Sequence, residues 1–345
     1  MTDDLYSPFW NGKVTEESVI LVKNGDEKPK GKLLFPPSEI LKVTSYDGAK
    51  EFEENDYSFS GNEFFAEDNS PLPFMTEEMT HGEGKAKEEG LGVMDGLVFT
   101  EGTGIVKYQV KVTYIYDAEK YKWGVLPEKK GTSLTNLYKK GRSGKNLNVL
   151  LYGDSIAAGC HASSVLNYPP YLPVWGKTVS EKIGEYFGGG ATFTNISVGG
   201  YISRQGLENI DEKLSAVEKG SIDLAILHFG MNDGSWKVTF AEYKSNMQKM
   251  IDVLRKHSPE CDIIIVSNLV ANPLCSQDTE LTSSYLTADK ELETACERVV
   301  TVDMTTLCLE LFKTKKGLDL YANDINHPTD FLVRIFVTYI TESIF

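Results

Sequence analysis

The sequence is poor in cysteine and lacks the cysteine spacings that are typical of metal sites and disulfide frameworks. Its five cysteines are an odd number, and all of them lie in the second half of the chain: Cys160, Cys261, Cys275, Cys296 and Cys308. No two of them show the C-x-x-C spacing. Disulfide frameworks and zinc sites usually appear as even numbers or close pairs of cysteines. The pattern therefore predicts free, buried thiols in a reducing compartment.

Positive charge is also scarce. The formal net charge is −15, because 50 Asp and Glu residues outweigh 35 Lys and Arg residues. Nucleic acids and anionic membranes select clusters of Lys and Arg, so we expect the chain to bind neither. Residues 51–100 alone carry 13 acidic and 2 basic side chains, which is typical of a solvated surface. Within this stretch, we expect residues 76–90 to form a long loop.

Long hydrophobic runs are absent. No stretch approaches the roughly 18 apolar residues of a membrane-spanning helix. The first ten residues, MTDDLYSPFW, have neither the basic start nor the apolar segment of a signal peptide. We therefore expect a cytoplasmic protein, unless a leader has been trimmed from the chain.

The strand and helix signals of the sequence change character near residue 120. Before this point, short runs rich in β-branched and aromatic residues end at Gly, Asn, Asp or Pro, and QVKVTYIY at 109–116 alternates as a strand with one wet face should. Such runs predict an antiparallel β-sandwich or jelly roll over residues 1–120. Residues 121–146, with the polar stretches EKKGTS and KKGRSGKN, are expected to be a linker.

From residue 147 to residue 345, apolar strand signals alternate with amphipathic helical signals. The predicted strands are residues 147–152, 192–197, 222–229, 262–270 and 298–303. Near-continuous apolar strands separated by helices are typical of a parallel sheet that is covered on both faces. We therefore predict a five-stranded, doubly wound α/β domain, which binds its ligands beyond the carboxyl ends of its strands.

Polar motifs follow several of these strands. They are GDS at 153–155, VGG at 198–200, GMND at 230–233 and, before the last helix, DINH at 324–327. A serine nucleophile needs a base, a group that orients the base, and donors for the developing oxyanion. Ser155, His327 and Asp324 could supply the first three, because a carboxylate in Asp-x-x-His can reach Nδ1 of the imidazole. The amides of Ser155 and Gly200 and the side chain of Asn232 could supply the donors.

These four motifs, in this order, resemble the four motif blocks of the SGNH (GDSL) hydrolase superfamily, over roughly residues 147–345. The resemblance implies that Ser155 is the nucleophile and that Asp324 and His327 complete the catalytic triad. It also implies that Gly200 and Asn232 join the Ser155 amide in the oxyanion hole. No cofactor is expected.

Two alternatives concern the same motifs. Gly199 stands beside Gly200 and could be the donor instead, although the spacing from Asn195 favours Gly200. Asp324 and His327 are also metal-ligand types, but no second His or Cys cluster supports a metal site, and we expect no metal. A further histidine, His161, follows Ser155 too closely to be the expected base and is predicted to line the loop.

Three residues near the motifs are candidates for contacting a substrate. Tyr168 lies in the long segment after Ser155, and Trp236 follows the GMND motif. Flat aromatic faces suit sugar rings, and core packing is the alternative for both. Asp154 is the third candidate, with loop bracing through backbone hydrogen bonds as its alternative role.

A strand-rich domain ahead of an SGNH domain is similar to the layout of carbohydrate esterase family two. The function that this resemblance implies is a serine esterase that removes acetyl groups from a carbohydrate, acting on a small-molecule or oligosaccharide ester. The alternatives are a short-chain lipase or thioesterase with the same triad, and a non-catalytic glycan-binding protein on an SGNH scaffold. The oligomeric state is left open.

Overall fold

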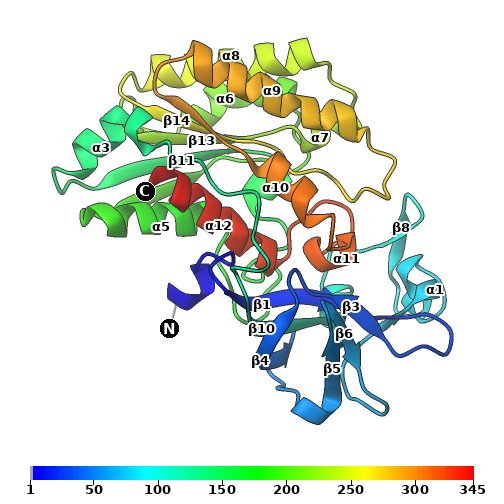
Figure 1. The fold of residues 1–345 in the computed structure, drawn as a ribbon. Coiled ribbons are helices and arrows are strands. Elements are labelled where there is room, and N and C mark those ends of the chain that lie inside the picture. Colours follow the sequence, from blue (N-terminus) through cyan, green and yellow to red (C-terminus); the bar gives the residue numbers. More distant parts are fainter. Residues whose placement is uncertain (1–2) are drawn as a thin grey trace.

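The computed structural model describes residues 3–345, which form a strand-rich part followed by an α/β part (Figure 1). The α/β part is built on a five-stranded sheet with the order β12-β11-β13-β14-β15. The strands are β11 (Leu147–Gly153), β12 (Ala191–Asn195), β13 (Leu224–His228), β14 (Asp262–Val266) and β15 (Val299–Val302). All neighbouring strands are parallel. The predicted doubly wound α/β fold is confirmed.

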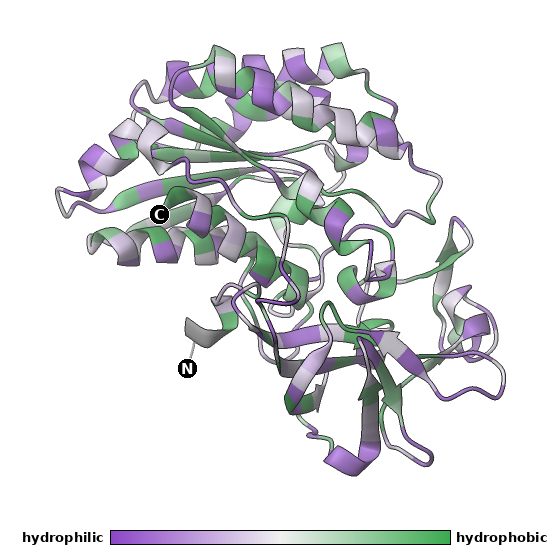
Figure 2. Ribbon diagram, in the orientation of Figure 1, coloured by the Kyte–Doolittle hydropathy of each residue, from purple (hydrophilic) through white to green (hydrophobic). Residues whose placement is uncertain are grey.

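Helices cover both faces of this sheet, and each face has its own hydrophobic cluster. One face carries α6 (Ser203–Leu214), α8 (Phe240–His257) and α9 (Thr279–Ala295), and the other carries α5 (Trp175–Phe187), α10 (Met304–Leu311) and α12 (Asp330–Ile344). The central strands between the two layers are largely hydrophobic (Figure 2). β13, β14 and β15 are buried at every position, as expected for a sheet that is covered on both faces.

The strand-rich part contains two packed sheets and a hairpin. The sheet order is β1-β10-β4 in one sheet and β5-β6-β3-β2-β7 in the other, and β8 pairs with β9. The strands are β1 (Lys13–Ile20), β2 (Val22–Lys23), β3 (Lys30–Lys32), β4 (Pro37–Ser45), β5 (Tyr57–Ser60), β6 (Glu63–Ala66), β7 (Met75–Thr76), β8 (Gly92–Met94), β9 (Leu97–Phe99) and β10 (Gln109–Tyr116). Only the short β2–β7 pair is parallel. The predicted all-β architecture is confirmed.

Two segments are more ordered than the sequence predicts. Residues 76–90, expected to be a loop, contain α1 (Glu77–Thr80) and α2 (Lys85–Glu88). Their buried side chains, Met79 and Ala86, anchor them in a hydrophobic cluster. The expected linker 121–146 contains α3 (Thr135–Gly141), and Leu137 of this helix is fully buried. Burial of these apolar side chains explains why the two segments form helices although their composition is mostly polar.

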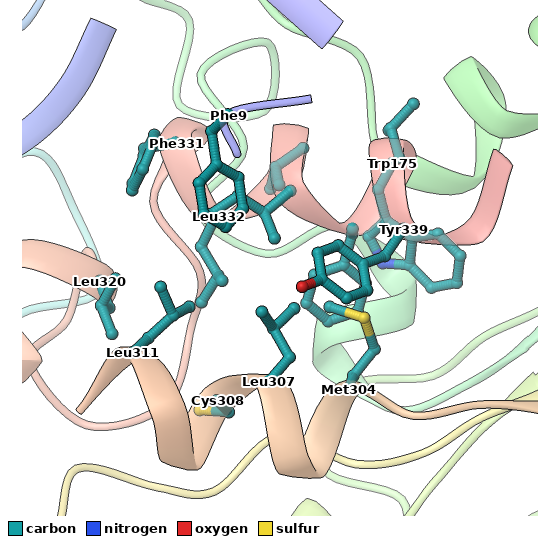
Figure 3. Close-up of a cluster of buried hydrophobic side chains, with 14 of the residues drawn as sticks. Phe9, Trp175, Met304, Leu307, Cys308, Leu311, Leu320, Phe331, Leu332 and Tyr339 are labelled. Atoms are coloured by element: carbon teal, nitrogen blue, oxygen red, sulfur yellow. The ribbon is translucent and has the colours of Figure 1, made fainter. Parts of the chain in front are cut away.

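The strand-rich part and the α/β part share one continuous hydrophobic core. Phe9 ahead of β1, Leu307 of α10 and Leu332 of α12 belong to the same buried cluster (Figure 3). Trp123 donates a hydrogen bond of 2.7 Å to the Tyr339 hydroxyl of α12 and packs its ring against Phe9. The relative position of the two parts is therefore set by core packing. Among the described residues, no helix is long and apolar enough to cross a bilayer, and all five cysteines are free.

A buried ion pair reinforces this contact. Lys315, which precedes α11 (Gly317–Leu320), lies 2.7 Å from the Glu17 carboxylate of β1, and both side chains are fully buried. Glu17 also accepts hydrogen bonds from the Leu34 amide at 2.9 Å and the Tyr114 hydroxyl at 2.6 Å. Burial raises the pKa of Glu17, and Lys315 opposes that shift. Glu17 therefore needs its partner to remain charged.

Replacing Lys315 with methionine should destabilise the protein by about 3–5 kcal/mol at pH 7, because it leaves a buried carboxylate without its cation. The difference from the parent should shrink at pH 5. The reason is that the variant raises the folded-state pKa of Glu17 further, and a protonated carboxyl group carries no charge to desolvate. Chemical denaturation of both proteins at the two pH values measures this. Lys313→Met is the matched control, since Lys313 pairs with Glu310 on the surface, and it should cost less than about 1 kcal/mol. Equal losses for both variants would contradict the role of the buried pair.

Candidate active site

Ser155 is positioned by a strand, a one-residue turn and a short helix. β11 ends at Gly153, Asp154 follows, and α4 (Ser155–Ala158) begins at the serine. The Asp154 carboxylate caps α4 by accepting a hydrogen bond of 2.9 Å from the Ile156 amide. Gly153 is required because a Cβ atom there would lie 2.1 Å from the carbonyl oxygen of His228 on the neighbouring strand. This tight packing fixes Ser155 at the carboxyl edge of the sheet.

His327 reaches Ser155 from the loop between α11 and α12. The side-chain oxygen of Asn323 accepts hydrogen bonds from the backbone amides of Ile325, Asn326 and His327 at 3.0–3.1 Å. The loop thus folds around Asn323 and directs the imidazole inward. Nε2 of His327 lies 3.0 Å from Oγ of Ser155, although 172 residues separate them in the sequence. The structure therefore brings together the predicted nucleophile and the predicted base.

The imidazole of His327 is neutral at neutral pH. Burial, and to a lesser extent the neighbouring His161, lower its pKa to about 3. A neutral ring has a lone pair on one nitrogen, and a proton acceptor at Ser155 must place that lone pair on Nε2. The group bound to Nδ1 decides whether it does.

Asp324, the predicted acid of the triad, is not bound to His327. Its side chain accepts a hydrogen bond of 2.9 Å from the Asn272 amide, whose nitrogen also contacts the Asp324 carbonyl oxygen at 2.8 Å. The backbone of Asp324 is left-handed, with φ of 60°, and its side chain lines a second cavity beside Gly317 and Lys316. Burial raises its pKa to about 8, so the carboxyl group is largely uncharged at pH 7. Among residues 3–345, no hydrogen bond or ion pair joins it to the imidazole.

His161 occupies the position expected for the acid. Its Nδ1 lies 2.8 Å from Nδ1 of His327, and its Nε2 lies 3.2 Å from the carbonyl oxygen of Thr100, directly after β9. The side chain is only 2% exposed, and burial lowers its pKa. Glu101 is the nearest carboxylate to His327, 3.9 Å from Nδ1, and it is 66% exposed. Sequence reasoning missed Thr100 and Glu101, because they lie in the strand-rich part and carry no motif.

The predicted oxyanion donors surround the same cavity as the serine. Ser155, Gly200 and Asn232 all line a cavity of about 730 Å³. Asn232, in α7 (Met231–Ser235), donates a hydrogen bond of 3.1 Å to the carbonyl oxygen of Tyr201. That bond ties the third motif to the loop of the second. Gly200 has a left-handed backbone with φ of 80°, and Gly200 rather than Gly199 lies on the cavity wall.

None of the three predicted substrate contacts is among the residues that line this cavity. Asp154 is fully buried as the cap of α4, and Tyr168 is buried in a small cluster with Val106 and Ala322. Both therefore take the structural alternatives, bracing and packing. Trp236 is 74% exposed, and its two chain neighbours line the cavity.

The residues that do line the cavity are mostly polar. They come from both parts of the chain and include Asp95, Glu101, Ser235, Lys237, Ser276, Gln277, Asp278, Asn323 and Asn326. Apolar side chains contribute Met94, Phe99, Ala271, Cys275 and Ile325. The strand-rich part therefore forms one wall of the cavity that contains Ser155.

Among the described residues, Glu101, His161 and His327 form a group whose ligand atoms all lie within 4.8 Å of one another. A cation between the two rings would require both Nδ1 atoms to be unprotonated. A neutral His327 would then carry its proton on Nε2 and could not accept one from Ser155. The 2.8 Å contact is a hydrogen-bond distance.

A serine hydroxyl 3.0 Å from an imidazole nitrogen is an arrangement that could serve as a nucleophile and its base. The chain also matches a known family. The GDSL-like lipase/acylhydrolase family model matches residues 151–331, more than half of the chain. The protein therefore belongs to the GDSL-like lipase/acylhydrolase family, a family of ester hydrolases. No curated protein sequence matches the chain.

Several solved structures resemble the fold. A two-domain esterase (CEX) active on acetylated mannans is 19% identical, with a TM-score of 0.47 over 62% of this chain and 53% of that one. The match thus spans about half the length of the CEX chain. A lipase/acylhydrolase from Enterococcus faecalis is 19% identical, with a TM-score of 0.44 over 57% of this chain and 95% of that one. Axe2, an acetylxylan esterase from Geobacillus stearothermophilus, is 18% identical, with a TM-score of 0.46 over 58% of this chain and 95% of that one. These are likenesses of fold alone.

The placement of Asp324 leads to a testable expectation. Asp324→Asn should keep kcat for ester hydrolysis within about tenfold of the parent, because an uncharged carboxyl group bound to Asn272 resembles an amide. A triad carboxylate replaced by asparagine typically costs about 10⁴ in kcat. Asparagine also tolerates the left-handed backbone. Steady-state kinetics on p-nitrophenyl acetate measure the difference. A loss of a thousandfold or more in kcat would show that Asp324 acts as the triad acid after all.

Proposed function

We propose that this protein is a serine esterase in which Ser155 attacks an ester carbonyl and His327 accepts the serine proton. The observation that carries the proposal is the 3.0 Å contact between Oγ of Ser155 and Nε2 of His327 at the wall of an open cavity. Burial and the neighbouring His161 lower the pKa of His327, so the ring is neutral at neutral pH and Nε2 can accept a proton, although the imidazolium that forms is costly in this environment. A buried serine beside a neutral imidazole is the arrangement that activates a hydroxyl group.

The reaction then proceeds through two similar halves. Ser155 attacks the carbonyl carbon, its proton moves to Nε2 of His327, and the carbonyl oxygen becomes an oxyanion. The amides of Ser155 and Gly200 and the Asn232 side chain are the donors for this charge. His327 next gives its proton to the departing alkoxide and leaves an acyl-enzyme on Ser155. A water molecule, deprotonated by His327, hydrolyses the acyl-enzyme and restores the serine. The chain's own residues can perform every step.

We further propose an acetylated carbohydrate as the substrate. The polar lining of the cavity offers acids, amides and hydroxyls that can hydrogen-bond a polyol, and the exposed Trp236 lies in the chain between two lining residues, Ser235 and Lys237. A small acyl group needs little apolar surface, whereas a long acyl chain needs a continuous apolar groove. The polar lining therefore favours a sugar ester over a lipid.

The nucleophile and one oxyanion donor can be tested directly. Ser155→Ala should reduce kcat by a thousandfold or more, since removal of a nucleophile leaves only residual catalysis. Asn232→Ala should reduce kcat by about a hundredfold or more, because it removes a donor to the oxyanion. Ser215→Ala is the control, because its hydroxyl bonds only the nearby Glu212 carbonyl on the surface. Kinetics on p-nitrophenyl acetate and thermal melting of each variant supply the data. Parental activity of Ser155→Ala would refute the mechanism.

The substrate class needs a separate comparison. Acetate release from a panel of acetylated oligosaccharides should exceed that from simple alkyl acetates, and p-nitrophenyl esters should be cleaved more slowly as the acyl chain grows beyond acetyl. Rising activity with chain length would instead support a lipase or thioesterase. Failure of a fluorophosphonate probe to label Ser155 in the folded protein would favour a glycan-binding protein without catalytic activity.

A further inference from the structure

The contact on the far side of the imidazole, away from Ser155, has no counterpart in the predicted triad. A histidine that acts as a base must hold its proton on Nδ1, and in serine hydrolases a carboxylate usually accepts that proton in a hydrogen bond. Here Nδ1 of His327 faces Nδ1 of His161 at 2.8 Å. Two facing ring nitrogens form a hydrogen bond only if one of them carries a proton and the other does not.

The carbonyl oxygen of Thr100 decides which nitrogen carries the proton. A carbonyl oxygen can only accept, so Nε2 of His161, 3.2 Å away, must be the protonated nitrogen of that ring. Nδ1 of a neutral His161 is then an acceptor, and Nδ1 of His327 must donate to it. The lone pair of His327 is thereby left on Nε2, facing Oγ of Ser155 at 3.0 Å. With both rings neutral, one arrangement of protons satisfies all three contacts.

We infer that His161 is the residue that orients the catalytic imidazole, and that the strand-rich part sets the tautomer of both rings through the carbonyl group of Thr100. His161 thus takes the place of the triad carboxylate as a positioning residue, within the proposed esterase mechanism. The chain of contacts runs from Thr100 through His161 and His327 to Ser155. Thr100 belongs to the strand-rich part, whereas Ser155 belongs to the α/β part.

The local structure shows that His161 is held in this position. The ring is 2% exposed, and the residue has a left-handed backbone with φ of 67°, which is uncommon for a residue other than glycine. Two residues on, the Ser163 amide donates to the Asp330 carboxylate at the start of α12, at 3.1 Å. The segment that carries His161 is therefore fixed to the helix that follows His327.

The proton balance of the reaction is consistent with this role. When His327 takes the Ser155 proton on Nε2, its Nδ1 proton stays in the bond to His161, and no proton has to cross to the second ring. His161 carries no charge to stabilise the imidazolium that forms. Glu101, whose carboxylate lies 3.9 Å from Nδ1 of His327, is the anion nearest to that charge. Its exposure of 66% means that water screens the attraction.

The inference can be tested by three substitutions at one position. His161→Leu removes the acceptor and should lower kcat by about a hundredfold with little change in KM, because substrate binding is untouched while the base loses its orientation. His161→Asn places an amide oxygen near the position of Nδ1, tolerates the left-handed backbone, and should retain kcat within about tenfold. His161→Gln can keep the contact with Thr100 but offers no acceptor at the Nδ1 position, and it should resemble leucine.

Two further readouts separate orientation from folding. The labelling rate of Ser155 by a fluorophosphonate should follow kcat across the three variants. The melting temperatures of His161→Asn and His161→Gln should be similar. A low-field imidazole N–H resonance in the proton NMR spectrum should be present in the parent and in His161→Asn and absent in His161→Leu. If leucine destabilises the fold, the comparison of asparagine with glutamine still decides the question.

The outcomes distinguish this inference from the proposed function. Parental kcat in both His161→Leu and His161→Gln, together with an inactive Ser155→Ala, would overturn the role of His161 and leave the esterase standing. Activity in Ser155→Ala would overturn the esterase itself.

Activity should also survive dialysis against EDTA, because both rings are hydrogen-bonded. A loss on dialysis that zinc restores would show that the two Nδ1 atoms bind a metal ion, and would overturn the proton arrangement. Glu101→Gln should lower kcat only severalfold, given its exposure.

Discussion

The buried contact between β1 and the segment before α12 is the constraint on which the site depends. Glu17 and Lys315 form a fully buried ion pair, and four residues after Lys315 the Asp319 carboxylate accepts a hydrogen bond of 2.8 Å from the Ile20 amide. These bonds join the strand-rich part to the short helix α11, which leads directly into the His327 loop. A buried, hydrogen-bonded pair has one favourable geometry, since any displacement leaves a desolvated charge without a partner. The loop that carries His327 is thereby held relative to the strand-rich part, in which Thr100 and Glu101 directly follow β9.

Burial is the main cause of the shifted pKa values at and near the site. Burial lowers the pKa of His327 to about 3 and raises the pKa of Asp324 to about 8. The same effect raises the pKa of Asp154 to about 7. In each case burial is the largest cause, because a low-dielectric environment disfavours the charged form of any side chain. Burial thus favours the neutral forms of His327 and Asp154, whereas the open cavity in front of Ser155 also carries charged side chains such as Glu101 and Lys237. In the proposed mechanism, the hydrogen-bond donors to the oxyanion are fixed dipoles at the wall of this cavity.

The sequence predicted the framework of the site better than its contacts. Parallel strands end at one edge of a sheet, so motifs that follow such strands must converge, and Ser155, Gly200, Asn232 and His327 do line one cavity. The direction of a single side chain depends instead on partners far away in the sequence. Asp324 has the spacing of a triad acid, but its left-handed backbone and Asn272 turn its carboxyl group to another cavity.

The same reasoning explains the errors in the strand-rich part and the segment after Ser155. The order of residues 76–90 depends on two apolar side chains, Met79 and Ala86, in a charged stretch, which is a weak sequence signal. Tyr168 was a candidate for the cavity because of its residue type, yet its burial against Val106 and Ala322 is a tertiary contact that no local pattern contains. His161 was judged by its sequence distance from Ser155, whereas its role depends on Thr100, 61 residues earlier.

A histidine in the place of the acid is physically reasonable in this environment. A carboxylate at the position of His161, which is 2% exposed, would have to be desolvated, and burial would raise its pKa as it raises that of Asp324. A protonated acid cannot reliably hold the Nδ1 proton of the base. A neutral imidazole accepts the same hydrogen bond without a buried charge, provided that its other nitrogen is fixed as a donor. The Thr100 carbonyl meets that requirement, and the weaker stabilisation of the imidazolium is partly offset by Glu101. The site therefore needs the strand-rich part in order to be complete.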